Sequence, residues 1–304
     1  MKKLSVAALF AALFFCCGAP LAVYAVPFYD LDPKPIVLRA EFSTSYASSG
    51  EARKHNVALA AKALDGALVA SGEEFSFNAR VGERSAERGY REAKIIVGGK
   101  FAEGVGGGVC QVSTTLYNAV LLAGLRVTES HPHSLQVGYV SAGADAMVNY
   151  YFADLRFVND TKNPVYLETK ADGSRLIVRV YGEALKGRIA LKSRVVGEIA
   201  PEEKIVVDTA GEYPDLYKGE RRIVRYGKAG VKSELYLLRY SESGALTEKI
   251  LLRKDRYLPI DTVIAEGTAE PPAAEEGTDL SEIPPNTDRA EGGGDGILPE
   301  GGAA

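Results

Sequence analysis

The spacing of apolar residues predicts two amphipathic helices in the first half of the chain. The first stripe recurs at intervals of three and four residues and consists of Val57, Ala60, Ala61, Leu64 and Leu68. The pair Ser71-Gly72 is expected to end this helix. A second helix is expected at about 111–123, where three apolar residues share one face before the stop at Gly124, namely Val112, Leu116 and Val120.

From Val127 onward the apolar pattern changes to short runs that are rich in β-branched and aromatic residues. These runs predict strands at 137–140, 147–152, 155–158, 165–169 and 176–181. The last two runs are expected to pair across the turn Ala171-Asp172-Gly173. Because the helices precede a set of antiparallel strands, the pattern predicts an α+β fold for this part of the chain.

A second unit is expected over residues 190–268, where the sequence has no long helical stripe. Glycines punctuate this stretch, and Ser243-Gly244 separates two strand candidates at 234–240 and 246–252. The pattern therefore predicts a small all-β module.

The two ends of the chain differ in composition from the rest. Residues 1–25 combine Lys2 and Lys3 with an apolar run that is shorter than the roughly 20 residues of a membrane span, which predicts a cleaved signal peptide and no remaining span. Two phenylalanines before Cys16 disfavour lipoprotein processing at Cys16 or Cys17. Residues 26–40 are expected to be a proline-punctuated linker. Residues 269–304 hold nine acidic residues against Arg289 alone, which predicts a disordered acidic tail.

Composition narrows the class of protein and points to one side chain. The chain has 304 residues, 46% hydrophobic and 25% charged, which is typical of a soluble globular protein. A formal net charge of −4 gives no reason to expect a nucleic-acid partner. Loss of the signal peptide would leave Cys110 as the single cysteine, so the exported protein would contain no internal disulfide.

Cys110 follows a glycine run at the expected start of the second helix. The stretch reads Gly106-Gly107-Gly108-Val109-Cys110-Gln111. Glycines leave the amides of a helix N-terminus uncovered, and the helix dipole there favours a thiolate, which is the nucleophilic form of cysteine. The alternative is a buried cysteine that packs under a tight turn. A phosphate-binding loop is disfavoured because no Gly-Lys-Ser/Thr ending follows.

A nucleophilic cysteine needs a base and a group that orients the base. Of the three histidines, His55 is remote in sequence, and His131 precedes a proline and is expected in a turn, so His133 is the preferred base. The acid candidates are Asp145 and Asp154, with Asp145 preferred. A cysteine on a helix followed by a histidine and an acid is the chain order of transglutaminase-like and papain-like sites. Zinc binding by the two neighbouring histidines and the cysteine lacks a fourth ligand, so no metal or cofactor is predicted.

Several separated motifs resemble the VanW family, named from accessory proteins of glycopeptide-resistance clusters. They lie in order within an expected domain at 41–185 and are Glu41 to Ser45, Phe75 to Asn78, Gly106 to Tyr117, His133-Ser134, Asp145-Ala146 and Asp154 to Phe157. The resemblance by itself does not assign an activity. The expected binding residues are Gly106, Gly107, Gly108, Gln111, Ser134, Asn78 and Asp154.

The predicted all-β module at 190–268 is similar to the G5 domain. The similarity rests on Gly219, Tyr226 to Gly230, Pro259 and Glu266 to Thr268. G5 domains are associated with cell-wall proteins and N-acetylglucosamine polymers, so the resemblance implies contact with glycan.

Together these features predict a secreted, cell-wall-associated protein that acts on or binds peptidoglycan. The first hypothesis is acyl transfer or amide hydrolysis on peptide stems through Cys110, His133 and Asp145. The alternative is a non-catalytic adaptor that binds cell-wall glycan, in which the glycine loop and the histidine only shape a cleft. A third hypothesis is that the acidic tail at 269–304 is a spacer through the wall with no recognition role.

Overall fold

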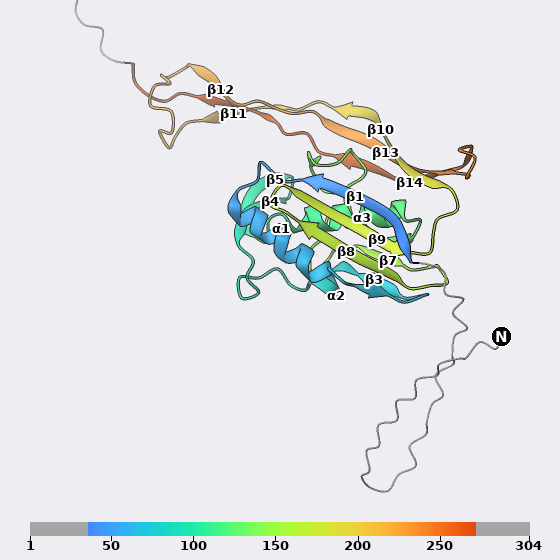
Figure 1. The fold of residues 1–304 in the computed structure, drawn as a ribbon. Helices are drawn as coiled ribbons and strands as arrows, with labels where there is room; N and C mark the ends of the chain where they lie inside the picture. The colour runs from blue at the N-terminus through green and yellow to red at the C-terminus, as the bar shows by residue number, and fades with distance from the viewer. Residues whose placement is uncertain (1–35, 272–304) are drawn as a thin grey trace, which may run out of the picture. The chain divides into compact units, whose positions relative to one another are not determined.

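The structure is a computed structural model that describes residues 36–271 and is mostly antiparallel β-structure with few helices (Figure 1). These residues form two compact units. The first unit consists of residues 36–200 and 229–259, and the second of 201–228 and 260–271. The predicted signal peptide, most of the predicted linker and almost all of the predicted acidic tail lie outside the described residues.

The first unit is built on a four-stranded antiparallel sheet whose order is β1-β9-β8-β2. The strands are β1 (Val37–Ser45), β9 (Arg175–Gly182), β8 (Val165–Ala171) and β2 (Leu68–Val69). Alternate residues of β9 point into the core, where Leu176, Val178 and Val180 are fully buried. The predicted hairpin between the last two strands of this segment is present as β8 and β9.

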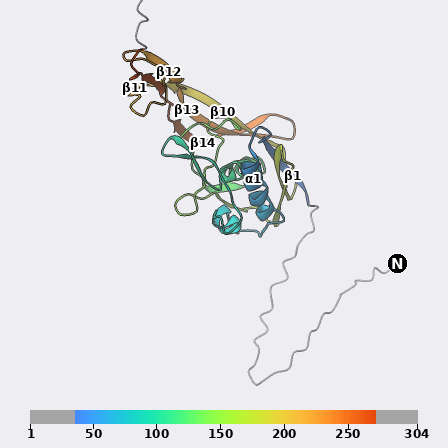
Figure 2. The same ribbon diagram turned by 90° about the vertical axis from the view of Figure 1, so that its left-hand side faces the viewer.

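The helices of the first unit are α1 (Glu51–Leu64), α2 (Phe77–Val81) and α3 (Val109–Leu122). Helix α1 packs along β8 and helix α3 along β1 and β9, so the two long helices cover the apolar face of the main sheet (Figures 1 and 2). Val112, Leu116 and Val120 form the predicted apolar stripe of α3 and are all buried. No helix within residues 36–271 combines the length and the apolar content needed to cross a membrane.

Three further small sheets complete the first unit. One has the order β3-β7-β6, with β3 (Glu74–Ser76), β7 (Arg156–Val158) and β6 (Arg126–Glu129). The second is a hairpin of β4 (Glu92–Val97) and β5 (Lys100–Val105). The third has the order β10-β13-β14, with β10 (Arg188–Ile199), β13 (Gly230–Tyr240) and β14 (Leu246–Tyr257).

The β10-β13-β14 sheet shares the core of the first unit. Leu235 and Leu237 of β13 belong to the same buried cluster as Leu116 of α3. The amide of Leu258, just after β14, donates to the carbonyl of Ser134 at 2.8 Å. The segment predicted as one all-β module, residues 190–268, is therefore divided between the two compact units.

The second unit contains a three-stranded sheet whose order is β11-β15-β12. Its strands are β11 (Glu203–Val207), β15 (Thr262–Glu266) and β12 (Arg221–Arg225). Strands β11 and β15 run parallel, whereas β12 and β15 run antiparallel.

Three expectations about individual elements differ from the structure. Helix α1 ends at Leu64 because Gly66 turns the chain at φ 69° and donates to Leu167, which places Leu68 in β2. Residues 137–140 and 147–152, which were expected to be strands, are loops. The second loop contributes only isolated β-bridges. The end of the predicted linker belongs to strand β1. The α+β class and the transglutaminase-like or papain-like core stay predictions.

Candidate functional site

The glycine run places Cys110 in the first turn of α3. Gly108 is the N-cap residue and has φ 109°, a conformation that side chains rarely adopt. A Cβ atom on Gly107 would lie 2.6 Å from the carbonyl oxygen of Ala93 in β4. Two of the glycines are thus required by backbone geometry, and together they let the chain turn tightly from the β4–β5 hairpin into the helix that presents the thiol.

Polar residues of α3 hold the loop that carries Asp145. Asn118 donates to the carbonyl of Ala144 at 2.7 Å, and Ser113 donates to that of Ala146 at 2.6 Å. The amide of Ala146 in turn donates to the hydroxyl of Thr114 at 3.0 Å. Since these groups are fully buried, their hydrogen bonds fix the loop without help from solvent. The helix that carries the Cys110 thiol therefore also fixes, through its polar face, the loop that carries the Asp145 carboxylate.

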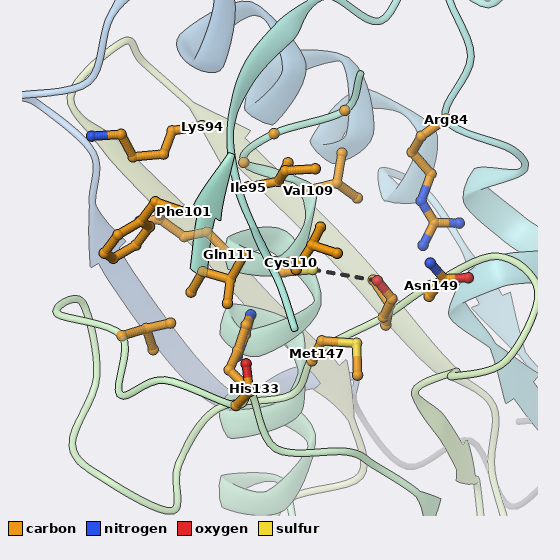
Figure 3. Close-up of a pocket in the computed structure, with 18 of the residues that line it drawn as sticks. Arg84, Lys94, Ile95, Phe101, Val109, Cys110, Gln111, His133, Met147 and Asn149 are labelled. Carbon is orange, nitrogen blue, oxygen red and sulfur yellow. Dashed lines mark hydrogen bonds between the residues drawn. The ribbon is translucent and has the colours of Figure 1, made fainter. Parts of the chain in front are cut away.

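His133 and Asp145 form a buried imidazole–carboxylate pair. Both the backbone amide and Nδ1 of His133 contact Oδ2 of Asp145 at 2.7 Å. The side chains are 6% and 1% exposed. Because Nδ1 is engaged by the carboxylate, the other ring nitrogen, Nε2, is left for Cys110, and the ring lies beside the thiol in Figure 3.

Strand β14 supplies the remaining partners of Asp145. Arg253 Nη2 donates to Oδ1 at 3.0 Å, and the hydroxyl of Tyr257 donates to the same oxygen. The Tyr257 hydroxyl also accepts from the amide of Gly143 at 2.7 Å. Burial raises the pKa of Asp145, but the hydrogen bond and charge of His133, the charge of Arg253 and the Tyr257 hydroxyl outweigh burial and lower it. Asp145 is therefore held as a carboxylate.

The electrostatics of the site favour an ion pair between thiolate and imidazolium. Burial lowers the pKa of His133, but hydrogen bonds with Asp145 and Cys110 raise it to about 9. Burial raises the pKa of Cys110, yet its hydrogen bond with His133, the charge of His133, the contact with the Val148 carbonyl and the charge of Arg84 lower it overall. As a residue Cys110 is partly exposed and lines the cavity described below, and its sulfur lies 3.4 Å from the Val148 oxygen (Figure 3). A thiolate is the reactive state of a cysteine.

A cavity of about 880 Å³ lies over the thiol. Its walls come from the β4–β5 hairpin, the glycine run, the start of α3 and the loops at 132–139 and 147–152. Gly106, Gly107, Gly108 and Ser134 line the cavity, as expected of ligand-binding residues. Their binding role stays a prediction.

The side chains of the three other expected binding residues make hydrogen bonds within the protein, and their binding role also stays a prediction. The Gln111 side chain is 1% exposed, donates to Thr44 and the Ser45 carbonyl, and accepts from Arg53. Although its backbone lines the cavity, its side chain has no free donor for a ligand, because both of its amide functions are already engaged within the protein.

Asn78 and Asp154 do not line the cavity. Asn78 donates to the carbonyls of Asn149 and Ala153, at 3.0 and 2.9 Å, and so ties α2 to the loop at 147–152. Asp154 accepts from Ser76 and from the amide of Asn78. Both are buried and have partners within the protein, and their binding role stays a prediction.

His131 is turned away from the thiol site. Its Nε2 contacts Glu129 at 2.9 Å, whereas His133 contacts Asp145, so the two histidines do not converge. No three His, Cys, Asp or Glu side chains within residues 36–271 are grouped as metal ligands.

Sequence reasoning missed Arg253 and Tyr257, which contact Asp145 from more than 100 residues away. One signal was available. Arg253, Asp255 and Tyr257 occur at intervals of two and therefore share one face of a strand, an unusual gathering of polar groups beside an apolar run.

The site thus consists of a helix-start thiol, an imidazole and a carboxylate, held in an antiparallel β-rich domain. The family model described as "VanW like protein" matches residues 52–181, which include all three side chains. Over this segment the chain is similar to the VanW family.

Two curated proteins are similar to parts of the chain. The chain is 40% identical over 168 residues to the uncharacterized protein YoaR of Bacillus subtilis (strain 168), covering 54% of this chain and 55% of that protein. It is 28% identical over 138 residues to the vancomycin B-type resistance protein VanW of Enterococcus faecalis (strain ATCC 700802 / V583), covering 44% and 50%. The chain therefore spans about half the length of the curated relatives that it matches.

Two solved structures match 27% of the chain each. They are the G5 domain of an IgA1 protease, with 19% identity, 93% coverage of that chain and a TM-score of 0.19, and the G5 domain HP0197-G5, with 22%, 100% and 0.15. TM-scores this low carry no argument about fold or ligand, and the G5-like module stays a prediction.

Proposed function

We propose that the first unit is an enzyme domain that cleaves or transfers amide bonds in the peptide stems of peptidoglycan. The observation that supports the chemistry is the contact of His133 Nδ1 with Asp145 at 2.7 Å, beside a thiol in the first turn of a helix. A carboxylate on Nδ1 orients an imidazole and stabilises its charged form, which is the arrangement that activates a cysteine nucleophile.

The proposed reaction proceeds through a thioester. The Cys110 thiolate attacks the carbonyl carbon of the amide, and a bond forms between sulfur and carbon. The carbon–nitrogen bond breaks, and the leaving amine takes a proton from His133 Nε2. Water, or an acceptor amine, then attacks the thioester while neutral His133 removes its proton. The sulfur–carbon bond breaks, and the thiolate–imidazolium pair is restored.

The start of α3 would stabilise the oxyanion that forms during the attack. The amides of Val109 and Gln111 already donate to the carbonyls of Gly106 and Gly108, so the proposed oxyanion donor in the first turn is the amide of Cys110, where the helix dipole favours negative charge. The left-handed Gly108 carries no side chain that would cover this turn. Preorganised amides of this kind typically contribute a factor of about 10²–10³ to a rate.

The choice of peptidoglycan rests on different grounds from the chemistry. The expected signal peptide would direct the protein out of the cytoplasm, and one relative is named for vancomycin resistance. We accordingly propose a secreted, cell-wall-associated protein whose predicted G5-like segment contacts glycan.

The test compares wild-type protein with Cys110→Ala and Cys110→Ser on purified muropeptides, with products followed by mass spectrometry. Wild type should convert stem peptides, and both variants should be inactive while retaining the wild-type thermal unfolding midpoint. His131→Gln is the matched control, since His131 lies outside the cavity and should leave turnover unchanged. No product from wild type, or equal product from the Cys110 variants, would refute the enzyme proposal.

A non-catalytic adaptor is the second candidate, because Cys110 is only partly exposed and the size of the cavity is compatible with a binding site. Iodoacetamide labelling across pH separates the two. A thiolate paired with His133 reacts with a midpoint below the ordinary thiol pKa of about 8.5, whereas a midpoint at or above that value favours the adaptor.

A further inference from the structure

The cavity over Cys110 has a strong bias toward positive charge. Its basic lining residues are Arg53, Arg84, Lys94 and Arg256. Glu83 is the one carboxylate among the described residues of the lining, and it accepts a hydrogen bond from Tyr151. None of the four basic residues forms an ion pair with another residue in the described range 36–271.

Arg84 is the basic residue that the protein holds most firmly near the thiol. Its Nη1 donates to the carbonyl of Gly82 at 3.0 Å, and its Nη2 donates to Asn78 Oδ1 at 2.8 Å. The guanidinium also lies 5.7 Å from the centroid of the Phe77 ring. Its partners are neutral, so they orient the group without neutralising it.

Keeping a half-buried guanidinium without a carboxylate is unfavourable, because burial removes water from the charge. Burial indeed lowers the pKa of Arg84. The Cys110 thiolate offsets part of this cost, but His133 already pairs with that thiolate. The remaining positive charge can be neutralised by an anionic group of a ligand.

The basic residues lie on more than one side of the thiol. In Figure 3, Arg84 and Lys94 appear on opposite sides of Cys110. Lys94 lies on the β4–β5 hairpin, 5.6 Å from the centroid of the Phe101 ring, and is exposed. A ligand that covers the sulfur therefore passes between two positive charges.

We propose that the cavity selects peptides that carry a free carboxylate near the bond attacked by Cys110, and that Arg84 binds this carboxylate. This inference rests on the proposed amide chemistry and names its substrate class. Stem peptides fit the requirement, because a γ-linked glutamate, and a diamino acid with two carboxyl groups, each leave a free carboxylate next to an amide. A peptide whose carboxylates have been converted to carboxamides is expected to be a poor ligand.

The test is equilibrium binding by the full chain carrying Cys110→Ser, which prevents turnover. The two probes are a muropeptide with a stem tripeptide and the same molecule with its carboxylates amidated. The free carboxylate form should bind ~10-fold or more tightly at low salt, as expected for a hydrogen bond to a partly buried charge. When Arg84→Gln is added to the Cys110→Ser chain, the ratio of the affinities for the two probes should fall close to one. Arg84→Lys in the same chain should restore part of the ratio.

Two further variants supply a control and a substitute test. Arg80→Gln is the matched control, since Arg80 lies on α2, outside the cavity, and should keep the full ratio. If Arg84→Gln does not fold, Lys94→Gln provides the test, because Lys94 is exposed and makes no hydrogen bond that the hairpin needs; it should reduce the ratio about twofold.

The outcomes separate the inference from the proposed function. Equal binding of the two probes, or an unchanged ratio in folded Arg84→Gln, overturns the carboxylate inference even if wild type cleaves muropeptides; where Arg84→Gln does not fold, an unchanged ratio in Lys94→Gln overturns it. A carboxylate preference that depends on Arg84, without any cleavage by wild type, supports the inference and refutes the enzyme proposal.

Discussion

The two compact units differ in how far their polar residues are buried. In the first unit, polar side chains such as Asp145, Ser113 and Asn118 are almost completely buried and are satisfied by named partners. In the second unit, all residues of β11 are exposed, and only one residue of β12 is partly covered. A buried polar group must be held in one geometry, whereas an exposed one is free to meet solvent or a partner. A catalytic site, whose polar groups must be held in fixed positions, is therefore expected only in the first unit.

The stabilising contacts differ in the same way. The first unit has a large continuous apolar cluster around α3 and the main sheet. The sheet of the second unit instead carries surface ion pairs, such as Arg221 with Glu266 and Lys204 with Asp261. Its few buried groups include Asp208, which accepts from the amides of Glu212 and Tyr213. The second unit thus offers a surface for contact and little interior.

The largest effect is expected from His133→Gln in the first unit. Turnover should fall about 10³-fold or more, because the variant removes both the proton donor and the positive charge beside Cys110. The iodoacetamide midpoint should rise above the ordinary thiol value, since burial would then act on the sulfur without the imidazolium. His131→Gln should change neither quantity. Equal effects of the two substitutions would contradict the assigned roles.

A large effect on stability is expected from Leu116→Ala, which empties space in the buried cluster of α3. The free energy of unfolding should fall by ~2–5 kcal/mol. The matched substitution in the second unit, Ile223→Ala, concerns a side chain that is 42% exposed and should cost less than about 1 kcal/mol. Denaturant unfolding measures both. Similar losses would remove the contrast between the units.

The pH dependence of turnover should report the raised pKa of His133. Its folded value of about 9 lies above the ordinary 6.5, so the protonated ring is stabilised, and this stabilisation is lost as the pH rises through about 9. Turnover should fall roughly tenfold per pH unit above that point, because the leaving amine then lacks its proton donor. It should also fall on the acid side once the thiolate is protonated. An alkaline decline near pH 6.5 would contradict the ion pair.

A smaller effect is expected from Tyr257→Phe on β14. Asp145 would lose one hydrogen-bond donor and the Gly143 amide its acceptor, so kcat should fall about tenfold with little change in KM. Tyr236→Phe on β13 is the control, since its hydroxyl contacts Glu234 and not Asp145. An unchanged alkaline limb and an unchanged kcat would show that the Tyr257 hydroxyl does not position the carboxylate.

The smallest effect is expected from Arg222→Gln in the second unit. The pair between Arg222 and Asp215 is exposed to solvent, so its loss should leave the unfolding midpoint unchanged within error. Thermal melts at low and high salt measure this. A clear destabilisation would mean that ion pairs, and not backbone pairing, hold this small sheet together.

Much of the first unit could be predicted from local patterns. The helix at 109–122 and the hairpin of β8 and β9 follow from periodicity and a turn signal, both of which act over a few residues. The segments 137–140 and 147–152 have the β-branched and aromatic residues of strands but are loops. Residues of both segments line the cavity, and neither segment pairs with a neighbouring strand. Pairing is a property of two segments, and one segment does not encode it alone.

The sequence by itself determined the thiol at a glycine-led helix start, the preferred histidine and the preferred acid, because each follows from chemistry within a short stretch. Only the tertiary structure brought Asp145 against His133 Nδ1, left Asp154 and His131 to structural contacts, and added Arg253 and Tyr257 from β14. The physical reason is sequence separation. Contacts across 108 and 112 residues depend on how whole sheets pack, and no local pattern reports that packing.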